Sequence, residues 1–217
     1  MPIYPPVRTF HARHGRISAA GRRALATDVP NVSVTRFPGP VNLRQLWPGR
    51  SIVIDFGAGM GAHTLELARA GHGVLMIDVH APGVARVASA AVARGWDHVA
   101  VHLGDGVELL TTGLAQQCAD EIHVLFPDPW PKARHHKRRL IGASFLAAAH
   151  AVLIPGGRLV IVSDDAGYTE HIRHEMETCQ LFSRDSEDFV YAPTGYHERA
   201  LRLGNSITVF SGRAAAP

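Results

Sequence analysis

Residues 51–61 have the sequence SIVIDFGAGMG. Its first part is a short, almost continuous apolar run that ends at Asp55, which predicts a strand buried on both faces of a sheet. Gly57, Gly59 and Gly61 follow at once, and glycine lets the backbone adopt positive φ and approach a ligand closely. A buried strand that leads through a glycine-rich turn into a helix is typical of nucleoside-binding α/β folds.

Strand-like and helix-like segments alternate from this point on. Further strands are predicted at 73–79, 98–103, 121–126 and 158–163, and helices at 61–70, 82–94, 137–153 and 168–179. Two strand-like segments joined by a loop, 182–191 and 205–211, end the chain. This alternation predicts a mostly parallel central sheet with helices on both faces, in an α/β, Rossmann-like fold whose ligands lie beyond the carboxyl ends of the strands.

Residues 1–50 differ from the rest in composition and charge. Prolines punctuate them, so we expect a basic arm with little regular structure apart from a short helix at 18–26 capped by Ser18, and a single domain over 51–217. The arm carries eight arginines and one acid, whereas the remaining residues carry 14 lysines and arginines against 18 acids. This asymmetry fits either an anionic partner or a solvated basic tail.

The composition excludes several classes of protein. No apolar run approaches the roughly 18 residues that span a bilayer, and the first sixteen residues lack the apolar stretch of a signal peptide. The two cysteines, Cys118 and Cys179, and the scattered histidines match no metal-binding spacing. We therefore expect a cytoplasmic protein, without membrane or metal partners, that is a monomer or a homodimer.

Acids follow three successive predicted strands. Asp55 ends the first, Asp78 ends the second 21 residues after Gly57, and Asp105 follows the third. A carboxylate at the position of Asp78 can accept both ribose hydroxyls of a nucleoside, and Asp105 is placed to meet an adenine edge. The GxGxG spacing departs from the GxGxxG of dinucleotide sites. Three carboxylates suit a cationic, phosphate-free nucleoside, and S-adenosylmethionine is such a ligand.

The segment after the fourth strand has the sequence FPDPWPK, residues 126–132. Three alternating prolines fix φ and remove backbone donors, so the loop is stiff and can hold Asp128 at the edge of the sheet. Trp130 offers a flat face to a base or an arginine, with core packing as the alternative. The basic residues Arg134, Lys137, Arg138 and Arg139 come next. At a predicted helix start they oppose the helix dipole, which indicates a phosphate partner.

These motifs resemble the bacterial tRNA (guanine-N7)-methyltransferases, through the long and specific signature FPDPWPK followed by RHHKRRL at 134–140. RHGR at 13–16 and TGYHERALRLG at 194–204 extend the likeness over most of the chain. The resemblance implies a class I methyltransferase fold with an antiparallel C-terminal strand, S-adenosylmethionine as cofactor, and methyl transfer to N7 of a guanine in the tRNA variable loop.

The resemblance also implies roles for individual residues. The cofactor would contact Asp55, Gly57, Gly59, Gly61, Asp78, Asp105 and Asp128; the target guanosine would contact Lys132, Asp164, Thr194, Gly195, Tyr196 and His197; and the tRNA backbone would contact Arg13, Arg16, Arg134, Lys137, Arg138 and Arg139. Asp55 stands where the family usually has Glu. Gly195 and His197 replace the usual lysine and glutamate, which puts the roles of these two residues in doubt.

Guanine N7 has an exposed lone pair and no proton, so its methylation needs alignment of the reacting atoms and no general base. Asp128 is the expected catalytic residue, because a carboxylate stabilises the purine cation or holds the guanine edge. Asp164 is the other candidate for that hydrogen bond, and Lys132 would grip a phosphate. Two alternatives remain: a methyltransferase of another substrate, and an RNA-binding module with a vestigial cofactor site.

Overall fold

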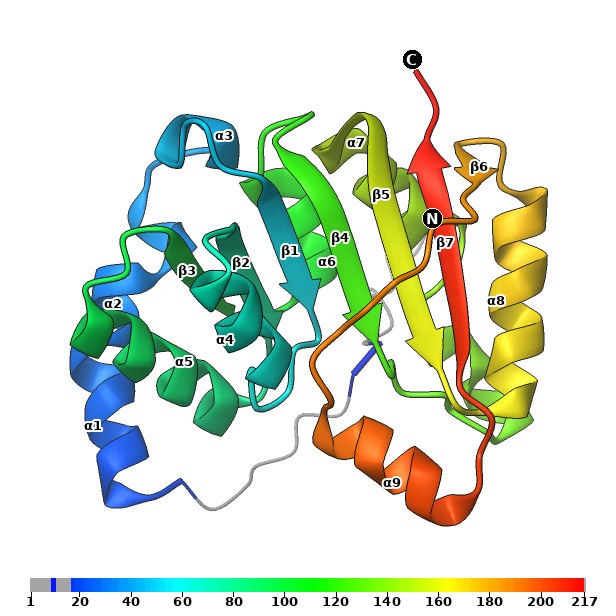
Figure 1. Cartoon of the computed structure of the whole chain (residues 1–217), viewed down its shortest axis with the longest axis horizontal. Coiled ribbons are helices and arrows are strands. Elements are labelled where there is room, and N and C mark those ends of the chain that lie inside the picture. The colour runs from blue at the N-terminus through cyan, green and yellow to red at the C-terminus, as the bar shows by residue number, and fades with distance from the viewer. Residues whose placement is uncertain (1–8, 11–16, 217) are drawn as a thin grey trace, which may run out of the picture.

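The computed structural model describes residues 9–10 and 17–216, and it forms one seven-stranded sheet in the order β3-β2-β1-β4-β5-β7-β6 (Figure 1). The strands are β1 (Ile52–Phe56), β2 (Gly73–Asp78), β3 (Val99–Leu103), β4 (Ala119–Leu125), β5 (Leu153–Ser163), β6 (Phe182–Arg184) and β7 (Thr208–Ala214). The α-helices are α1 (Ala19–Thr27), α2 (Val29–Val32), α3 (Leu43–Leu46), α4 (Ala62–Arg69), α5 (Ala81–Arg94), α6 (Gly106–Glu108), α7 (Ala143–Val152), α8 (Ala166–Thr178) and α9 (Gly195–Leu203). Two 3-10 helices, η1 (Val34–Arg36) and η3 (Ala133–Arg138), and one π-helical turn, η2 (Leu109–Gly113), complete the helical elements of the described residues.

The pairing of the strands confirms the predicted fold class. β1 pairs in parallel with β2 and β4, β2 with β3, and β4 with β5. β7 is antiparallel both to β5 and to β6, so the last strand is inserted between two strands made before it. The predicted mostly parallel sheet with an antiparallel C-terminal strand is therefore present, and its central strands are the continuous apolar runs expected of strands covered on both faces.

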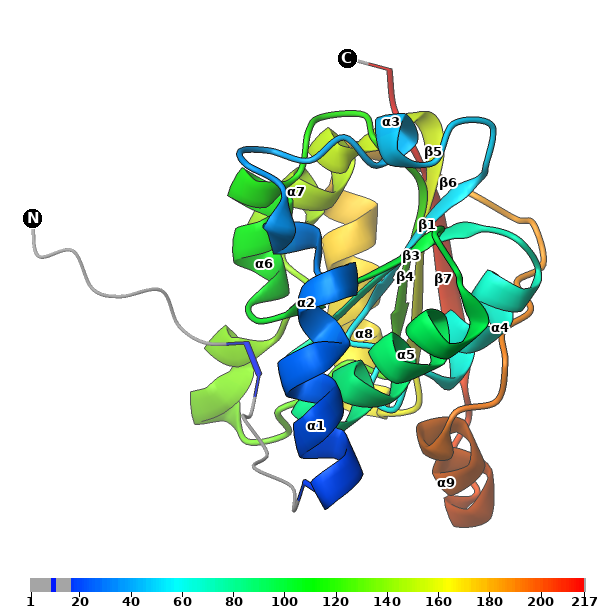
Figure 2. The same cartoon turned by 90° about the vertical axis from the view of Figure 1, so that its left-hand side faces the viewer.

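Each face of the sheet carries its own apolar core. One face packs against α7 and α8 through residues such as Ile54, Ile122 and Ile161, and the other packs α4 and α5 against Met76 and Val101. Figure 2 shows α1 and α2 continuing the second layer beside α5, at the β3 edge. None of the helices in the described residues is long and apolar enough to cross a membrane.

The prediction for residues 1–50 was wrong in its secondary structure. α1 begins after Ser18, whose side chain accepts from the Gly21 amide at 3.1 Å as predicted, but α2, η1 and α3 follow it. Val34 and Leu43 are fully buried in the main core, so this stretch packs because apolar residues fall between its prolines. The boundary at residue 50 stays a prediction.

Three further parts of the chain differ from the prediction. The helix expected at 137–153 is divided: Lys137 belongs to the η3 turn, Gly142 is extended, and α7 begins only at Ala143. β6 begins at Phe182 as predicted but ends at Arg184, and β7 is displaced toward the C-terminus, from 205–211 to Thr208–Ala214. The loop expected between the two strands contains α9, capped by Thr194. β5 begins at Leu153, upstream of the expected residue 158, through an irregular pairing with β4.

Candidate active site

A pocket of about 240 Å³ opens at the carboxyl ends of the parallel strands. Its wall combines the turn after β1, the ends of β2 and β4, and the N-terminus of α9. The predicted site residues in this wall are Gly57, Gly59, Asp78, Asp105, Asp128 and Tyr196. The structure therefore brings together residues from one end of the sheet that lie as far as 139 positions apart in sequence, from Gly57 to Tyr196.

The glycine turn leaves open space where a ligand would lie. Gly57, Gly59 and Gly61 all have positive φ, between 58° and 71°, and an added Cβ at Gly57 would meet no atom within 4 Å. Behind the turn the packing is tight, because an added Cβ at Gly83 of α5 would overlap the Gly59 carbonyl oxygen. Such a cradle, open on one side and braced on the other, fits a nucleoside held against the backbone.

Asp78 and Asp105 are held in fixed orientations. The Asp78 carboxylate accepts from the backbone N–H groups of Gly59 at 2.5 Å and His80 at 2.6 Å, one on each oxygen. Burial raises the pKa of Asp78, and these two hydrogen bonds oppose the rise. Asp105 caps α6 by accepting from the Val107 amide at 2.9 Å. Each carboxylate oxygen has more than one acceptor site, so both acids can also accept from a ligand in the pocket.

Asp55 lies beneath the pocket and does not line it. The residue is 1% exposed, and its Oδ2 accepts from the Thr64 hydroxyl at 2.6 Å, which ties β1 to α4. Its Oδ1 has no hydrogen-bond partner in the described part of the chain, and burial raises the pKa of the carboxyl to about 6. Gly61 also lies outside the pocket wall, with Val87 packed against it. Contact of Asp55 or Gly61 with a cofactor stays a prediction.

The proline-rich loop after β4 has left-handed backbone at both ends. Phe126 has φ 56° and Trp130 has φ 46°, values that are costly for bulky residues and that persist only where the surroundings enforce them. The Arg139 Nε donates to the Pro129 carbonyl at 3.1 Å and so braces the loop from behind. Asp128, between the two strained positions, is half-buried in the pocket wall, as predicted for a stiff loop.

Trp130 packs in the interior, which was the alternative to an exposed face, and the partner of its ring is an arginine, one of the two predicted partners. It is 4% exposed, its indole N–H donates to the Thr9 carbonyl at 3.2 Å, and the Arg138 guanidinium lies 4.9 Å from its ring centroid. Arg139 similarly lies over the ring of Tyr168, at 5.1 Å. Two of the predicted RNA-binding arginines thus contact aromatic rings of the protein.

The remaining basic residues of this segment are exposed. Lys132, Arg134 and Lys137 lie on or beside the η3 turn and outside the pocket wall. α7 begins only at Ala143, so these basic residues do not stand at its N-terminus and the predicted opposition to its dipole was wrong. Their exposure and positive charge are what favours contact with phosphates. Arg13 and Arg16 lie outside the described residues.

α9 carries the C-terminal site residues to the mouth of the pocket. Thr194 caps the helix by accepting from the His197 amide at 3.2 Å, and the exposed Tyr196 lies 3.8 Å from the position of a Cβ on Gly59. The Nδ1 of His197 is 2.8 Å from the Tyr191 hydroxyl, and Gly195 is exposed. Asp164, beyond the end of β5, accepts from the Asn205 amide at 3.0 Å, away from the pocket wall.

Several pocket residues had no predicted role. The wall also includes Thr9, Phe10, Met60 and His80. Thr9 is held there because its carbonyl accepts from the Trp130 indole N–H, a contact between distant residues that the sequence alone does not indicate. Within the described residues, no group of three or more His, Cys, Asp and Glu side chains is placed to hold a metal ion.

Comparison with known proteins bears on this geometry. Residues 49–210 match the family described as "Putative methyltransferase". The chain is 33% identical over 216 residues to the tRNA (guanine-N(7)-)-methyltransferase of Nitrosomonas europaea, covering 95% of this chain and 96% of the relative. It is 35% identical over 220 residues to the enzyme of that name from Burkholderia vietnamiensis, covering 96% and 86%.

A solved structure supports the fold independently. The 16S rRNA methyltransferase KamB superposes with a TM-score of 0.56 over 80% of this chain and 91% of that one, at 16% identity, a likeness that concerns the fold alone. These sequence matches agree with the class I methyltransferase fold and with the pocket at the carboxyl ends of its strands. The chain belongs to the tRNA (guanine-N7)-methyltransferase family.

Proposed function

We propose that this protein transfers a methyl group from S-adenosylmethionine to N7 of a guanine in the variable loop of tRNA, in the cytoplasm. The observation that carries the proposal is the composition of one pocket wall. Gly57, Gly59, Asp78 and Asp105 line it together with Asp128 and Tyr196. A nucleoside cofactor and a target base would thus meet in the same cavity, within a chain of this family.

The cofactor side is built for a cationic nucleoside. Asp78 is fixed by Gly59 and His80, so it accepts ribose hydroxyls without having to be reoriented. Asp105 is fixed in the same manner by its own helix. When bound, S-adenosylmethionine supplies an activated methyl group on a sulfonium, and the two carboxylates provide a favourable potential for that positive charge.

The substrate side has to orient a base without deprotonating it. Guanine N7 offers a lone pair, so Asp128 acts by accepting from the N1–H and amino group of guanine or by stabilising the positive charge that develops on the purine. The strained backbone at Phe126 and Trp130 holds Asp128 in place during this step. Lys132, Arg134 and Lys137 are exposed nearby in sequence and contact tRNA phosphates.

The test uses unmodified tRNA transcripts, labelled S-adenosylmethionine and chemical cleavage at 7-methylguanosine to map the product. We expect one methylated variable-loop guanine, and no transfer when that nucleotide is replaced by 7-deazaguanosine, which lacks N7. Asp128→Asn keeps the shape but loses the charge, and should lower kcat by about 10²- to 10³-fold while the Kd of the cofactor changes little. Full activity of Asp128→Asn would refute the role of Asp128. If the wild-type protein left the variable-loop guanine of the transcripts unmethylated, the proposed function would be refuted.

A further inference from the structure

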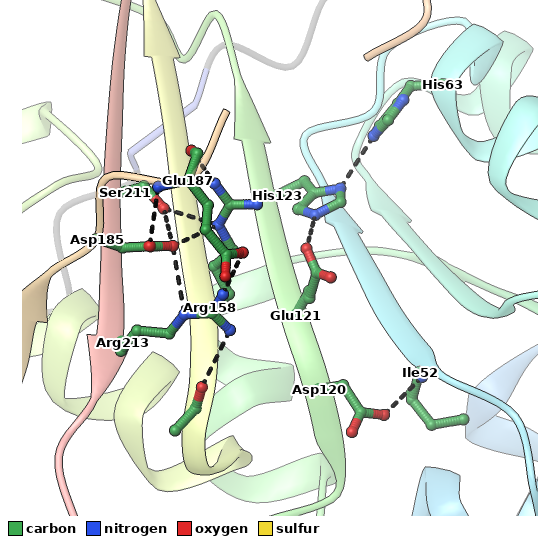
Figure 3. A network of polar contacts seen from close by, with 11 residues as sticks. Ile52, His63, Asp120, Glu121, His123, Arg158, Asp185, Glu187, Ser211 and Arg213 are labelled. Carbon is green, nitrogen blue, oxygen red and sulfur yellow. Dashed lines mark hydrogen bonds and ion pairs between the residues drawn. The ribbon is translucent and has the colours of Figure 1, made fainter. Parts of the chain in front are cut away.

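A hydrogen-bonded chain of buried side chains crosses from β4 to α4. The His123 Nε2 is 2.8 Å from the Glu121 carboxylate, and the His123 Nδ1 is 3.0 Å from the Nε2 of His63 (Figure 3). The backbone N–H of Ala192 lies at the far end, 3.4 Å from the His63 Nδ1. His63 is 4% exposed and His123 is 3% exposed, so water does not compete for the contact between the two rings, whereas Glu121 and Ala192 are half-buried.

The groups at the two ends of this hydrogen-bonded series determine which ring nitrogens carry a proton. A backbone N–H can only donate, and an ionised carboxylate can only accept. The His63 Nδ1 is therefore an acceptor, its Nε2 carries the proton given to His123, and the His123 Nε2–H donates to Glu121. Both imidazoles are neutral in this arrangement. Burial is the main cause that lowers the pKa of His63, to about 3, which agrees with the assignment.

Ala192 belongs to residues 185–194, which we call the strap. The strap leaves β6, crosses one face of the sheet in front of β7, β5 and β4, and ends at the cap of α9 (Figure 1). Its start is fixed by Arg158, which is 6% exposed, pairs with Asp185 at 2.8 Å and donates to the Glu187 carbonyl at 2.6 Å (Figure 3).

The middle of the strap lies on the histidines. The Phe189 ring centroid is 4.7 Å from that of His123, and the Tyr191 ring is 6.5 Å from that of His63. The Tyr191 hydroxyl then reaches the Nδ1 of His197, in the first turn of α9. Among the described residues, the hydrogen bond from Ala192 to His63 is the last one that ties the strap to α4 or the sheet before α9, the helix that carries Tyr196 into the pocket wall.

We infer that His63 and His123 are positioning residues, which with Glu121 fix the strap and thereby set the position of α9 and Tyr196 relative to the cofactor turn. His63 suits this role because it is the second residue of α4, two residues after Gly61 of the glycine turn. The inference rests on the proposed function for its consequence, namely that the target base is held against α9 at a set distance from the cofactor. His63 and His123 touch neither substrate nor cofactor in this scheme.

The test compares two substitutions at one position with a matched control. His63→Phe keeps a flat ring and removes both hydrogen bonds, whereas His63→Asn retains an oxygen that can accept from the Ala192 amide. His98→Phe is the control, because His98 is likewise buried and bonds the Ala68 carbonyl at 3.0 Å, far from the strap in the fold. The readouts are amide hydrogen exchange, cofactor affinity by calorimetry, and kcat/KM for tRNA.

We expect His63→Phe to speed amide exchange at Ala192 about tenfold and to lower kcat/KM for tRNA about tenfold, with the Kd of S-adenosylmethionine within about twofold of the wild type. His63→Asn should keep both the exchange rate at Ala192 and kcat/KM for tRNA close to the wild-type values. Unchanged amide exchange at Ala192 in His63→Phe would overturn the inference. It would also be overturned if His63→Phe weakened cofactor binding as much as it lowered kcat/KM for tRNA, or if the control His98→Phe gave the same pattern as His63→Phe. A wild-type protein that leaves tRNA unmethylated would refute the proposed function alone, since hydrogen exchange still tests the anchor.

The tautomers give a second, independent readout. In protein labelled with ¹⁵N at histidine, His63 should show an unprotonated Nδ1 and a protonated Nε2 from pH 8 down to pH 5, because its pKa lies near 3. A protonated Nδ1 of His63 anywhere in this range would exclude an acceptor for the Ala192 amide and would overturn the assignment.

Discussion

Replacing the buried carboxyl of Asp55 by an amide should make the protein more stable at neutral pH and not in acid. The folded-state pKa of Asp55 is raised from 3.8 to about 6, with burial as the main cause. Between these values the folded protein holds a proton that the unfolded chain has released, so stability is lost as pH rises from about 4 to about 6. A rise of about two pKa units corresponds to about 3 kcal/mol of stability lost at pH 7 and above.

Asp55→Asn cannot ionise and so escapes this loss. Its amide oxygen can still accept from Thr64, but its NH₂ group takes the place of an oxygen that has no partner in the described part of the chain, at a cost of about 1–2 kcal/mol at every pH. The constant cost cancels when pH values are compared. We therefore expect the free energy of unfolding of the variant, relative to the wild type, to rise by about 2 kcal/mol between pH 4.5 and pH 8.

Urea unfolding of both proteins at four or five pH values, without cofactor, measures this difference. Asp188→Asn is the control, because that side chain is exposed on the strap and its replacement should give a flat difference. A flat difference for Asp55→Asn as well would mean that the carboxyl ionises freely in the folded state. A difference that grows toward acid would mean that Asp55 is stabilised as an anion. Either result would refute the reasoning.

Two further predictions concern ligand binding. Gly83→Ala places a methyl group against the Gly59 carbonyl and must displace the glycine turn, so calorimetry should show at least a tenfold rise in the Kd of S-adenosylmethionine; Gly142→Ala, which meets no atom within 4 Å, should bind normally. Arg134→Ala and Lys137→Ala each remove an exposed cation, so each should lower the slope of log Kd for tRNA against log salt by about one. Unchanged slopes would place the RNA on another surface.

The parallel sheet and the cofactor turn could be predicted because their signals are local. A strand covered on both faces must be a continuous apolar run, and the turn after β1 needs glycine wherever φ is positive. Asp78 and Asp105 follow from the same logic, since the ends of parallel strands meet at one edge of the sheet. These features depend on a few consecutive residues each.

The parts that were missed depend on contacts between distant residues. Lys137 and its neighbours favour a helix locally, yet Gly142 takes an extended conformation and α7 starts after it. Trp130 is buried because Thr9 and Arg138 cover it, and nothing near Trp130 in sequence indicates the partner 121 positions away. His63 and His123 are 60 positions apart and meet only because the fold brings the first turn of α4 near β4.

The insertion of β7 between β5 and β6 has a consequence for biosynthesis. The chain leaves the far edge of the sheet, builds the mouth of the pocket with α9, and only then returns to fill the gap beside β5. A nascent chain that ends before Thr208 therefore exposes the unpaired edge of β5 and leaves the C-terminal end of α9 without its connection to the sheet, so we expect it to be prone to aggregation.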